Sequence, residues 1–258
     1  MDPADVLSRT TDLPDVVVRY ASRPDAVVDL FLPSTRPATG GPPPLLVFLH
    51  GGFWREQYDR VHARPLAEAF AECGYVVALP EYRRVGGGGG WPTTAHDVLA
   101  AVRALPGLLD GLGVEVGATT LSGHSAGGHL ALWLATEGVA ADRVVPLAPV
   151  GDLRAAAAAG LGAGAVADLL GGQPDEVPDR YDAADPATRL DTRPACPVVI
   201  VHGADDAVVP VANSRGLVAR HPFVGLVELP GVEHFGLIDP LSSAAWPTVR
   251  DAVRVPPG

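Results

Sequence analysis

The segment from Gly123 to Gly127 reads Gly-His-Ser-Ala-Gly and places a serine between two glycines at the spacing G-x-S-x-G. This spacing is typical of a very tight turn from a strand into a helix, where only small residues fit beside the turn. Such a turn exposes the hydroxyl of Ser125 at a helix N-terminus, whose partial positive charge favours a developing anion. The alternative, a glycine-rich turn with an incidental serine, is disfavoured because a strand-like run precedes the segment and a helical pattern follows it. We therefore predict a nucleophilic serine.

Two further segments supply the base and the acid that a nucleophilic serine requires. A serine hydroxyl is a poor nucleophile at neutral pH unless a base removes its proton and an acid orients that base. Asp206 lies in the sequence H-G-A-D-D-A-V-V-P after a predicted strand, and the spacing H-G-x-x-D-x-x-V-P favours it over Asp205, which we assign to the loop. His234 follows the last predicted strand and is the predicted base. His221 also lies beyond the acid, but it ends a helical pattern and suits a surface or capping role.

The run His50-Gly51-Gly52-Phe53-Trp54 could form the third part of such a site. Acyl transfer creates an oxyanion, and a pair of glycines lets backbone N–H groups approach it closely. The predicted donors are the N–H groups of Gly52 or Phe53, together with that of Ala126 after the nucleophile. Phe53 and Trp54 would flank the mouth of the site and wall an apolar or aromatic substrate pocket, with core packing as the alternative for both.

The remaining histidines are not needed for this chemistry. Four lie within motifs but precede the acid, and we interpret them as hydrogen-bonding scaffold residues or pocket walls: His50, His124, His129 and His202. His62 and His96 lie on predicted helices and are assigned to the surface. No cluster of His, Cys, Asp and Glu has the spacing of metal ligands, so we expect neither a metal nor another cofactor.

The segments that position these residues alternate between strand-like and helix-like patterns. The predicted strands are Val16–Tyr20, Ala26–Leu32, Leu45–Leu49, Tyr75–Leu79, Thr119–Leu121, Val144–Leu147, Val198–Val201 and Val224–Leu229. The predicted helices are Arg60–Cys73, Thr93–Leu105, Ala126–Glu137, Asn213–Arg220 and Ser243–Val253. The first two strands are close enough for an antiparallel hairpin, and the later runs are nearly continuous in apolar residues, as in strands buried on both faces. This alternation predicts an α/β fold with an approximately eight-stranded, mostly parallel sheet flanked by helices.

Three stretches interrupt the alternation. Pro33–Pro44 is rich in proline and glycine and is predicted to be a loop, and the five glycines of Gly86–Gly90 predict a mobile loop. The stretch 152–193 has no clear strand and is interpreted as a small cap inserted over the carboxyl edge of the sheet. We therefore expect a single domain over residues 1–258.

Composition narrows the range of partners. Apolar residues make up 47% of the chain and charged residues 19%, which is typical of a globular protein. The net charge of −11 argues against nucleic acid or an anionic membrane as the main partner. No apolar run approaches the ~18 residues of a membrane span and the N-terminus shows no signal-peptide pattern, so we expect a cytoplasmic protein. Cys73 and Cys196 are too few for a disulfide framework and are expected to be independent buried thiols.

Together these motifs resemble those of one group of families, the α/β-hydrolase fold-3 group. This group includes hormone-sensitive-lipase-like esterases, BD-FAE-like carboxylesterases and kynurenine formamidases. The resemblance runs from about Leu45 to the C-terminus and is carried by His50–Trp54, Tyr82–Arg84, Gly123–Leu130, His202–Pro210 and the segment at His234. The H-G-G-x-W form is more similar to the formamidase branch than to the H-G-G-G lipase branch. The D-Y-R-L-A-P-E pattern of the lipase branch survives here only in Tyr82-Arg83 and Trp91-Pro92. The resemblance thus implies the fold and the Ser-Asp-His triad, but not the substrate.

The expected function is that of a serine hydrolase that cleaves a small-molecule ester or aryl formamide through an acyl-enzyme. Two alternatives stay open. A prolyl-oligopeptidase-type peptidase usually carries a large N-terminal propeller, for which this chain has no room. A non-catalytic ligand-binding protein of the same fold is disfavoured because all three triad residues are present in the expected order. The sequence is compatible with a homodimer and does not decide the oligomeric state.

Overall fold

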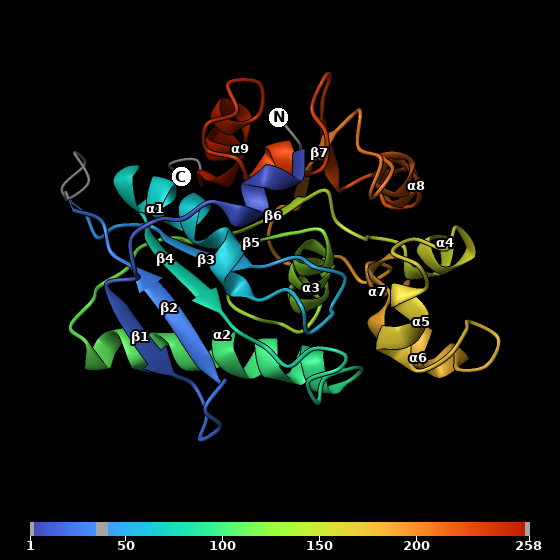
Figure 1. Ribbon diagram of the computed structural model, residues 1–258, viewed down its shortest axis with the longest axis horizontal. Coiled ribbons are helices and arrows are strands. Elements are labelled where there is room, and N and C mark those ends of the chain that lie inside the picture. Colours follow the sequence, from blue (N-terminus) through green and yellow to red (C-terminus); the bar gives the residue numbers. More distant parts are fainter. Residues whose placement is uncertain (1–2, 35–40, 256–258) are drawn as a thin grey trace.

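The computed structural model describes residues 3–34 and 41–255 and contains an eight-stranded sheet within those ranges (Figure 1). The strand order is β1-β2-β4-β3-β5-β6-β7-β8. β1 pairs with β2 and β2 with β4 in antiparallel fashion, and all later pairs are parallel. The strands are β1 (Val16–Arg19), β2 (Val27–Phe31), β3 (Leu45–Leu49), β4 (Val76–Pro80), β5 (Thr119–His124), β6 (Arg143–Leu147), β7 (Val199–Gly203) and β8 (Gly225–Leu229). The predicted α/β class and mostly parallel sheet are confirmed.

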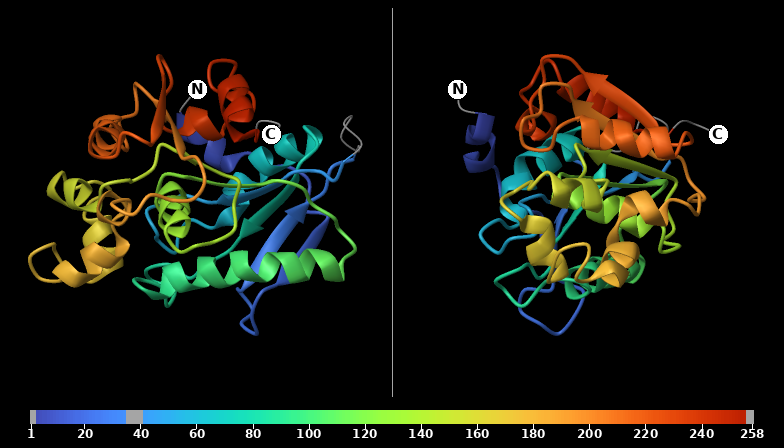
Figure 2. Two further views of the ribbon diagram at one scale, coloured as in Figure 1. Left: turned by 180° about the vertical axis from the view of Figure 1, so that it is seen from behind. Right: turned by 90° about the vertical axis from the view of Figure 1, so that its right-hand side faces the viewer.

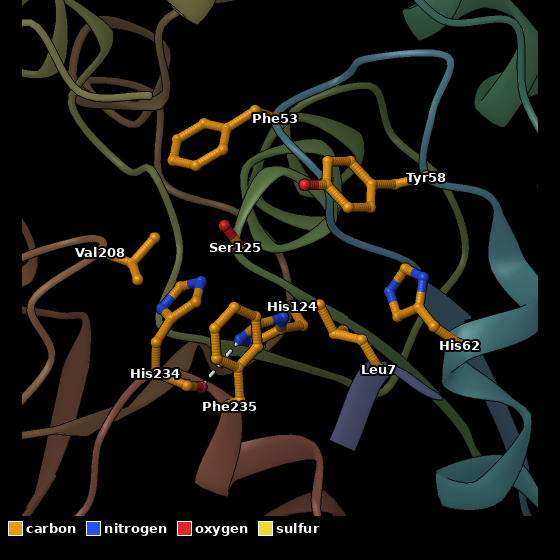
Figure 3. A pocket seen from close by; sticks show the side chains of 10 residues that line it. Leu7, Phe53, Tyr58, His62, His124, Ser125, Val208, His234 and Phe235 are labelled. Atoms are coloured by element: carbon orange, nitrogen blue, oxygen red, sulfur yellow. Dashed lines mark hydrogen bonds between the residues drawn. The ribbon is translucent and has the colours of Figure 1, made fainter. Parts of the chain in front are cut away.

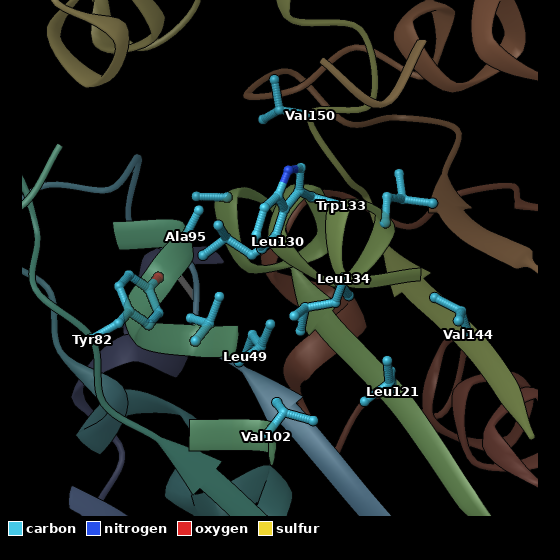
Figure 4. Close-up of a cluster of buried hydrophobic side chains, with 14 of the residues drawn as sticks. Leu49, Tyr82, Ala95, Val102, Leu121, Leu130, Trp133, Leu134, Val144 and Val150 are labelled. Atoms are coloured by element: carbon cyan, nitrogen blue, oxygen red, sulfur yellow. The ribbon is translucent and has the colours of Figure 1, made fainter. Parts of the chain in front are cut away.

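The central strands are apolar throughout because both faces of the sheet are covered. Every residue of β3 is buried, and alternate side chains enter different cores. Leu45, Val47 and Leu49 belong to one cluster, part of which is drawn in Figure 4, while Leu46 and Phe48 belong to the other. This division follows from the two-residue period of a strand.

Helices cover the two faces of the sheet (Figures 1 and 2). α2 (Thr93–Gly111) and α3 (Ala126–Ala135) contribute side chains to the cluster drawn in Figure 4. α1 (Arg64–Glu72) and α9 (Trp246–Val253) contribute to the opposite cluster, and α8 (Ala212–Arg220) packs on β8. Three 3-10 helices complete this layer: η1 (Pro3–Ser8), η2 (Arg60–Ala63) and η3 (Phe235–Ile238).

The predicted cap segment holds four short helices, α4 (Leu153–Ala158), α5 (Ala165–Leu170), α6 (Pro178–Ala184) and α7 (Pro186–Arg189). In Figure 1 the yellow helices α4, α5 and α6 gather at one end of the molecule. This segment reaches the H-G-G-F-W region, because the guanidinium of Arg55 bonds the carbonyl of Ala163 at 3.2 Å and the carboxylate of Asp168 at 3.1 Å. Its function as a cap stays a prediction.

Several local expectations differ from the structure. The five glycines 86–90 form a hydrogen-bonded turn, in which the N–H groups of Gly87 and Gly89 both donate to the carbonyl of Arg84 at 2.9 Å. A methyl group on Gly89 would lie 2.3 Å from the carbonyl oxygen of Arg83, so glycine is required by close packing.

Cys73 is exposed and Cys196 is partly exposed, which contradicts the expectation of buried thiols. Of the predicted loop Pro33–Pro44, residues 35–40 lie outside the described ranges.

Candidate active site

Ser125 lies on the turn between β5 and α3 with backbone angles φ 55° and ψ −116°. A non-glycine residue in this region is strained by about 1–3 kcal/mol and persists only where the surroundings hold it. The N–H of Ser125 donates to the carbonyl of Leu147 on β6 at 2.9 Å. A methyl group on Gly127 would lie 2.0 Å from the carbonyl oxygen of Leu49, and one on Gly123 would lie 2.4 Å from that of Gly127. The turn therefore requires both glycines of the motif.

Asp206 and His234 come together from the loops after β7 and β8. Nδ1 of His234 lies 2.6 Å from Oδ2 of Asp206. The other carboxylate oxygen of Asp206 accepts hydrogen bonds from the N–H groups of Val208 and Val209, both at 2.8 Å. Burial alone would raise the pKa of Asp206, but hydrogen bonds from His202 and His234 outweigh it and lower that pKa well below its usual value. Asp206 is therefore a carboxylate that can hold the His234 ring in one tautomer.

His124, directly before Ser125, supports the loop that carries His234. Its Nε2 lies 3.0 Å from the backbone carbonyl of His234, and the two ring centroids are 4.3 Å apart. Burial, and then the nearby His234, lower the pKa of His124 well below its usual value. A neutral imidazole at this position donates through Nε2 to the His234 carbonyl, which ties the base to the serine turn.

Ser125 and His234 line one pocket, which has about 430 Å³ of space free of protein atoms when the solvent at its mouth is included (Figure 3). Its lining residues are Leu7, Gly52, Phe53, Tyr58, His62, His124, Ser125, Val208, His234 and Phe235. The hydrogen bonds among the described residues include none between the Ser125 hydroxyl and His234. Catalytic hydrogen bonds are often long before substrate binds, so this geometry is compatible with a nucleophile and its base.

The H-G-G-F-W segment meets the pocket at Gly52 and Phe53, and three successive residues of it have positive φ, 109° at Gly52, 50° at Phe53 and 55° at Trp54. In the described loops and turns, the N–H groups of Gly52 and Phe53 donate no backbone hydrogen bond. Ala126, the third predicted donor, is the first residue of α3 and is fully buried. Gly52 and Phe53 both line the pocket, and the assignment of their N–H groups as oxyanion donors stays a prediction.

A buried polar cluster lies beneath this segment. Nε2 of His50 lies 3.1 Å from the carboxylate of Glu81, and its ring stacks on Tyr82 with centroids 4.2 Å apart. The Tyr82 hydroxyl donates to the carbonyl of His50 at 2.7 Å. The Glu81 carboxylate also pairs with Arg84 and accepts the N–H of Arg60 at 3.2 Å. These contacts fix the start of the H-G-G-F-W segment.

Trp54 does not wall the pocket, which corrects one predicted substrate contact. Its side chain is fully buried and packs edge-on against the ring of His129, with centroids 5.1 Å apart. The core-packing alternative therefore holds for Trp54. Phe53, the neighbouring residue, lines the pocket as predicted and lies against Gly162 of the predicted cap segment.

Several pocket residues carried no signal in the sequence. The sequence assigned His62 to the surface, but it is partly buried and lines the pocket. Burial, with a smaller contribution from the nearby His50, lowers the pKa of His62 to about 4. Tyr58, Leu7 and Phe235 also line it and come from three separate segments. The sequence could not show their convergence, because each lies in a loop or 3-10 helix without a periodic pattern.

The other histidines occupy scaffold positions. His129 bonds the carbonyl of Ala184 at 3.0 Å, and His202 bonds the carbonyl of Val209 and the hydroxyl of Ser214, both at 2.8 Å. His221 is the C-cap residue of α8, where its backbone N–H donates to the carbonyl of Leu217, as the capping alternative predicted. Its ring is buried and bonds the carbonyl of Ala187 on α7 at 2.8 Å, so it is not a surface residue. His96 is exposed, as predicted.

Within residues 3–34 and 41–255, no three His, Cys, Asp or Glu side chains are grouped so that they could hold a metal ion. The helices in these ranges also include none that is long and apolar enough to cross a membrane.

Comparisons with known proteins agree with this architecture. The chain is 27% identical over 245 residues to esterase LipC of Mycobacterium tuberculosis, covering 86% of this chain and 60% of that protein. It is 29% identical over 218 residues to the probable carboxylic ester hydrolase LipM of the same organism, covering 75% of this chain and 49% of that protein. The chain thus spans about half to three fifths of the length of these relatives.

Solved structures share the fold. A truncated carbohydrate esterase from gut microbiota superposes with a TM-score of 0.78 at 21% identity, over 94% of this chain and 96% of that one. Esterase B from Lactobacillus rhamnosis gives a TM-score of 0.78 at 20% identity, over 96% and 90% of the two chains. The fold is therefore the α/β-hydrolase fold. The family model BD-FAE matches residues 28–220, which is most of the chain and includes Ser125 and Asp206, and the chain belongs to the BD-FAE family.

Proposed function

We propose that this protein is a serine hydrolase that cleaves small carboxylic esters through an acyl-enzyme. The observation that carries the proposal is that the strained Ser125 and His234 line the same pocket. Nδ1 of His234 in turn lies 2.6 Å from Oδ2 of Asp206. Membership in the BD-FAE family and likeness to proteins named as ester hydrolases support an ester as the bond that is cleaved.

In the proposed mechanism, His234 takes the proton of Ser125 as the hydroxyl oxygen attacks the ester carbonyl. The negative charge that forms on the carbonyl oxygen is bound by backbone N–H groups of Ala126 and of Gly52 or Phe53. His234 then protonates the leaving alcohol, which departs and leaves the acyl group on Ser125. A water molecule, deprotonated by His234, hydrolyses this acyl-enzyme and restores the serine. Asp206 holds the His234 ring and stabilises its positive charge in both halves of the reaction.

An aryl formamide would pass through the same steps, but the names of the relatives support an ester, and the resemblance that suggested a formamide is weakened by the structure. The resemblance to kynurenine formamidases depends on the bulky end of the H-G-G-F-W segment. Trp54 is fully buried against His129 and does not line the pocket. The tryptophan of that motif therefore does not select a substrate in this chain.

Two measurements test the proposal. Ser125→Ala should abolish both labelling by a fluorophosphonate probe and turnover of p-nitrophenyl acetate, while Ser243→Ala, at an exposed serine outside the pocket, should retain both. Labelling that survives Ser125→Ala would refute the assignment of the nucleophile. Parallel kinetics on N-formylkynurenine and short aryl esters should give a higher kcat/KM for the esters, and the reverse order would establish a formamidase. Ligand binding without turnover of any ester or of N-formylkynurenine would indicate a non-catalytic member of the fold.

A further inference from the structure

Leu7 lines the pocket beside Ser125, although it lies 118 positions earlier in the chain. It belongs to η1, which packs against both η2 and η3. η2 carries His62 and η3 begins with Phe235, so these three segments together form one wall of the pocket (Figure 3). Leu7 is the contribution of the N-terminal segment to that wall.

Two contacts on either side of Leu7 hold η1 in place. Val6 is 7% exposed and belongs to the apolar cluster that includes residues of α1 and α9. The guanidinium of Arg9 forms a two-point ion pair with the carboxylate of Asp239, with Nη2 2.9 Å from Oδ2. Both partners of this pair are largely buried, at 22% and 15% side-chain exposure. A bidentate and partly desolvated pair is stronger and more directional than an exposed one. The contacts of Val6 and Arg9 therefore hold Leu7 in a fixed position in the pocket wall.

The position of Leu7 relative to the base indicates which part of a substrate it would meet. In Figure 3, His234 and Val208 lie on one side of Ser125, and Leu7, Tyr58 and His62 lie on the other. Because His234 must protonate the leaving oxygen, the alcohol portion of an ester belongs on the His234 side. The acyl chain then extends toward Leu7, Tyr58 and His62.

We propose that Leu7 is a specificity-determining residue, which closes the acyl side of the pocket and limits the length of the acyl chain. This inference rests on the proposed esterase function. Its physical basis is steric, since an acyl chain longer than the pocket would have to displace Leu7 and with it the contacts of Val6 and Arg9. Shortening Leu7 should admit longer acyl chains, and enlarging it should exclude chains that the native protein accepts.

The test compares kcat/KM for p-nitrophenyl acetate, butyrate and octanoate. We expect Leu7→Ala to raise the octanoate-to-acetate ratio of kcat/KM by about tenfold, the effect of a small change in an apolar pocket. Leu7→Trp should lower the butyrate-to-acetate ratio. Leu13→Ala is the matched control, because Leu13 is 80% exposed and is absent from the pocket lining, and it should keep the native ratios.

A second pair of variants tests the ion pair that holds η1. Asp239→Asn should shift the ratios in the same direction as Leu7→Ala, whereas Asp251→Asn, in an exposed pair with Arg250, should not. Folded Leu7→Ala and Leu7→Trp proteins with the native acyl profile would overturn the inference and leave the esterase function intact. If the native protein cleaved none of the esters, the proposed function itself would fail, and this inference with it.

Discussion

His234 and Asp206 are joined by a 2.6 Å contact between Nδ1 and Oδ2, although 28 positions separate them in the chain. The second oxygen of Asp206 is held by two backbone N–H groups, so the carboxylate has one orientation toward the imidazole. The neighbouring Asp205 is exposed and donates its backbone N–H to the carbonyl of Val232. The two aspartates of this loop therefore have different surroundings and should respond differently to substitution.

Asp206→Asn should lower kcat by about 10³- to 10⁴-fold, because an amide can donate to Nδ1 and favour the wrong tautomer of His234. Asp205→Asn is the matched control and should stay within about twofold of the native kcat, since it leaves the Asp206–His234 contact in place. Steady-state kinetics with p-nitrophenyl acetate measure both. Equal losses in the two variants would contradict the assignment of Asp206 as the orienting acid.

The features that are predicted best from the sequence are those that depend on residues close together in the chain. β3 has the predicted bounds, since a short run of five successive apolar residues suits a strand covered on both faces. Prediction was weaker where a local rule was overridden. α2 continues past Pro106 to Gly111, although proline usually ends a helix, because Leu105 and Leu109 continue its buried face. The wall formed by Leu7, His62 and Phe235 depends on distant segments meeting, and no local pattern records such a meeting.

Gly127→Ala should prevent folding or lower the free energy of unfolding by more than about 3 kcal/mol. The added methyl would lie 2.0 Å from the carbonyl oxygen of Leu49 and 2.4 Å from that of His50, and backbone atoms in a packed sheet cannot yield easily. Gly216→Ala, within α8, is the matched control, because a methyl there meets no atom within 4 Å. That change should stabilise the protein by about 0.4–1 kcal/mol. Urea unfolding measures both, and a tolerated Gly127→Ala would refute the close approach.

Glu81→Gln should destabilise the protein by about 3–5 kcal/mol, because it removes the negative charge that pairs with the buried Arg84. Burial raises the pKa of Glu81, but His50 and Arg84 outweigh it and lower that pKa to about 2, so the native side chain is a carboxylate at neutral pH. Glu228→Gln disrupts an exposed pair with Arg215 and should cost about 1 kcal/mol or less. A small loss for Glu81→Gln would show that the cluster beneath the H-G-G-F-W segment does not depend on its charge.

The pocket histidine His62 should make stability depend on pH in a defined window. Burial and the neighbouring His50 lower its pKa to about 4 in the folded protein, whereas a histidine in an unfolded chain titrates near about 6.5. Between these values the unfolded chain binds a proton that the folded protein does not, so the free energy of unfolding decreases as the pH falls from about 6.5 to 4.

His62→Gln removes this contribution, and the slope of the free energy of unfolding against pH should become shallower in that window by up to about 1.4 kcal/mol per pH unit. Burial raises the pKa of Asp185 to about 6, so Asp185 contributes to the pH dependence of stability with the opposite sign. This contribution is the same in the variant and the native protein and cancels when the two are compared. His96→Gln, at an exposed position on α2, is the matched control and should keep the native slope. Urea unfolding at several pH values between 4.5 and 6.5 measures all three proteins. An unchanged slope in His62→Gln would mean that His62 is protonated as readily in the pocket as in the unfolded chain.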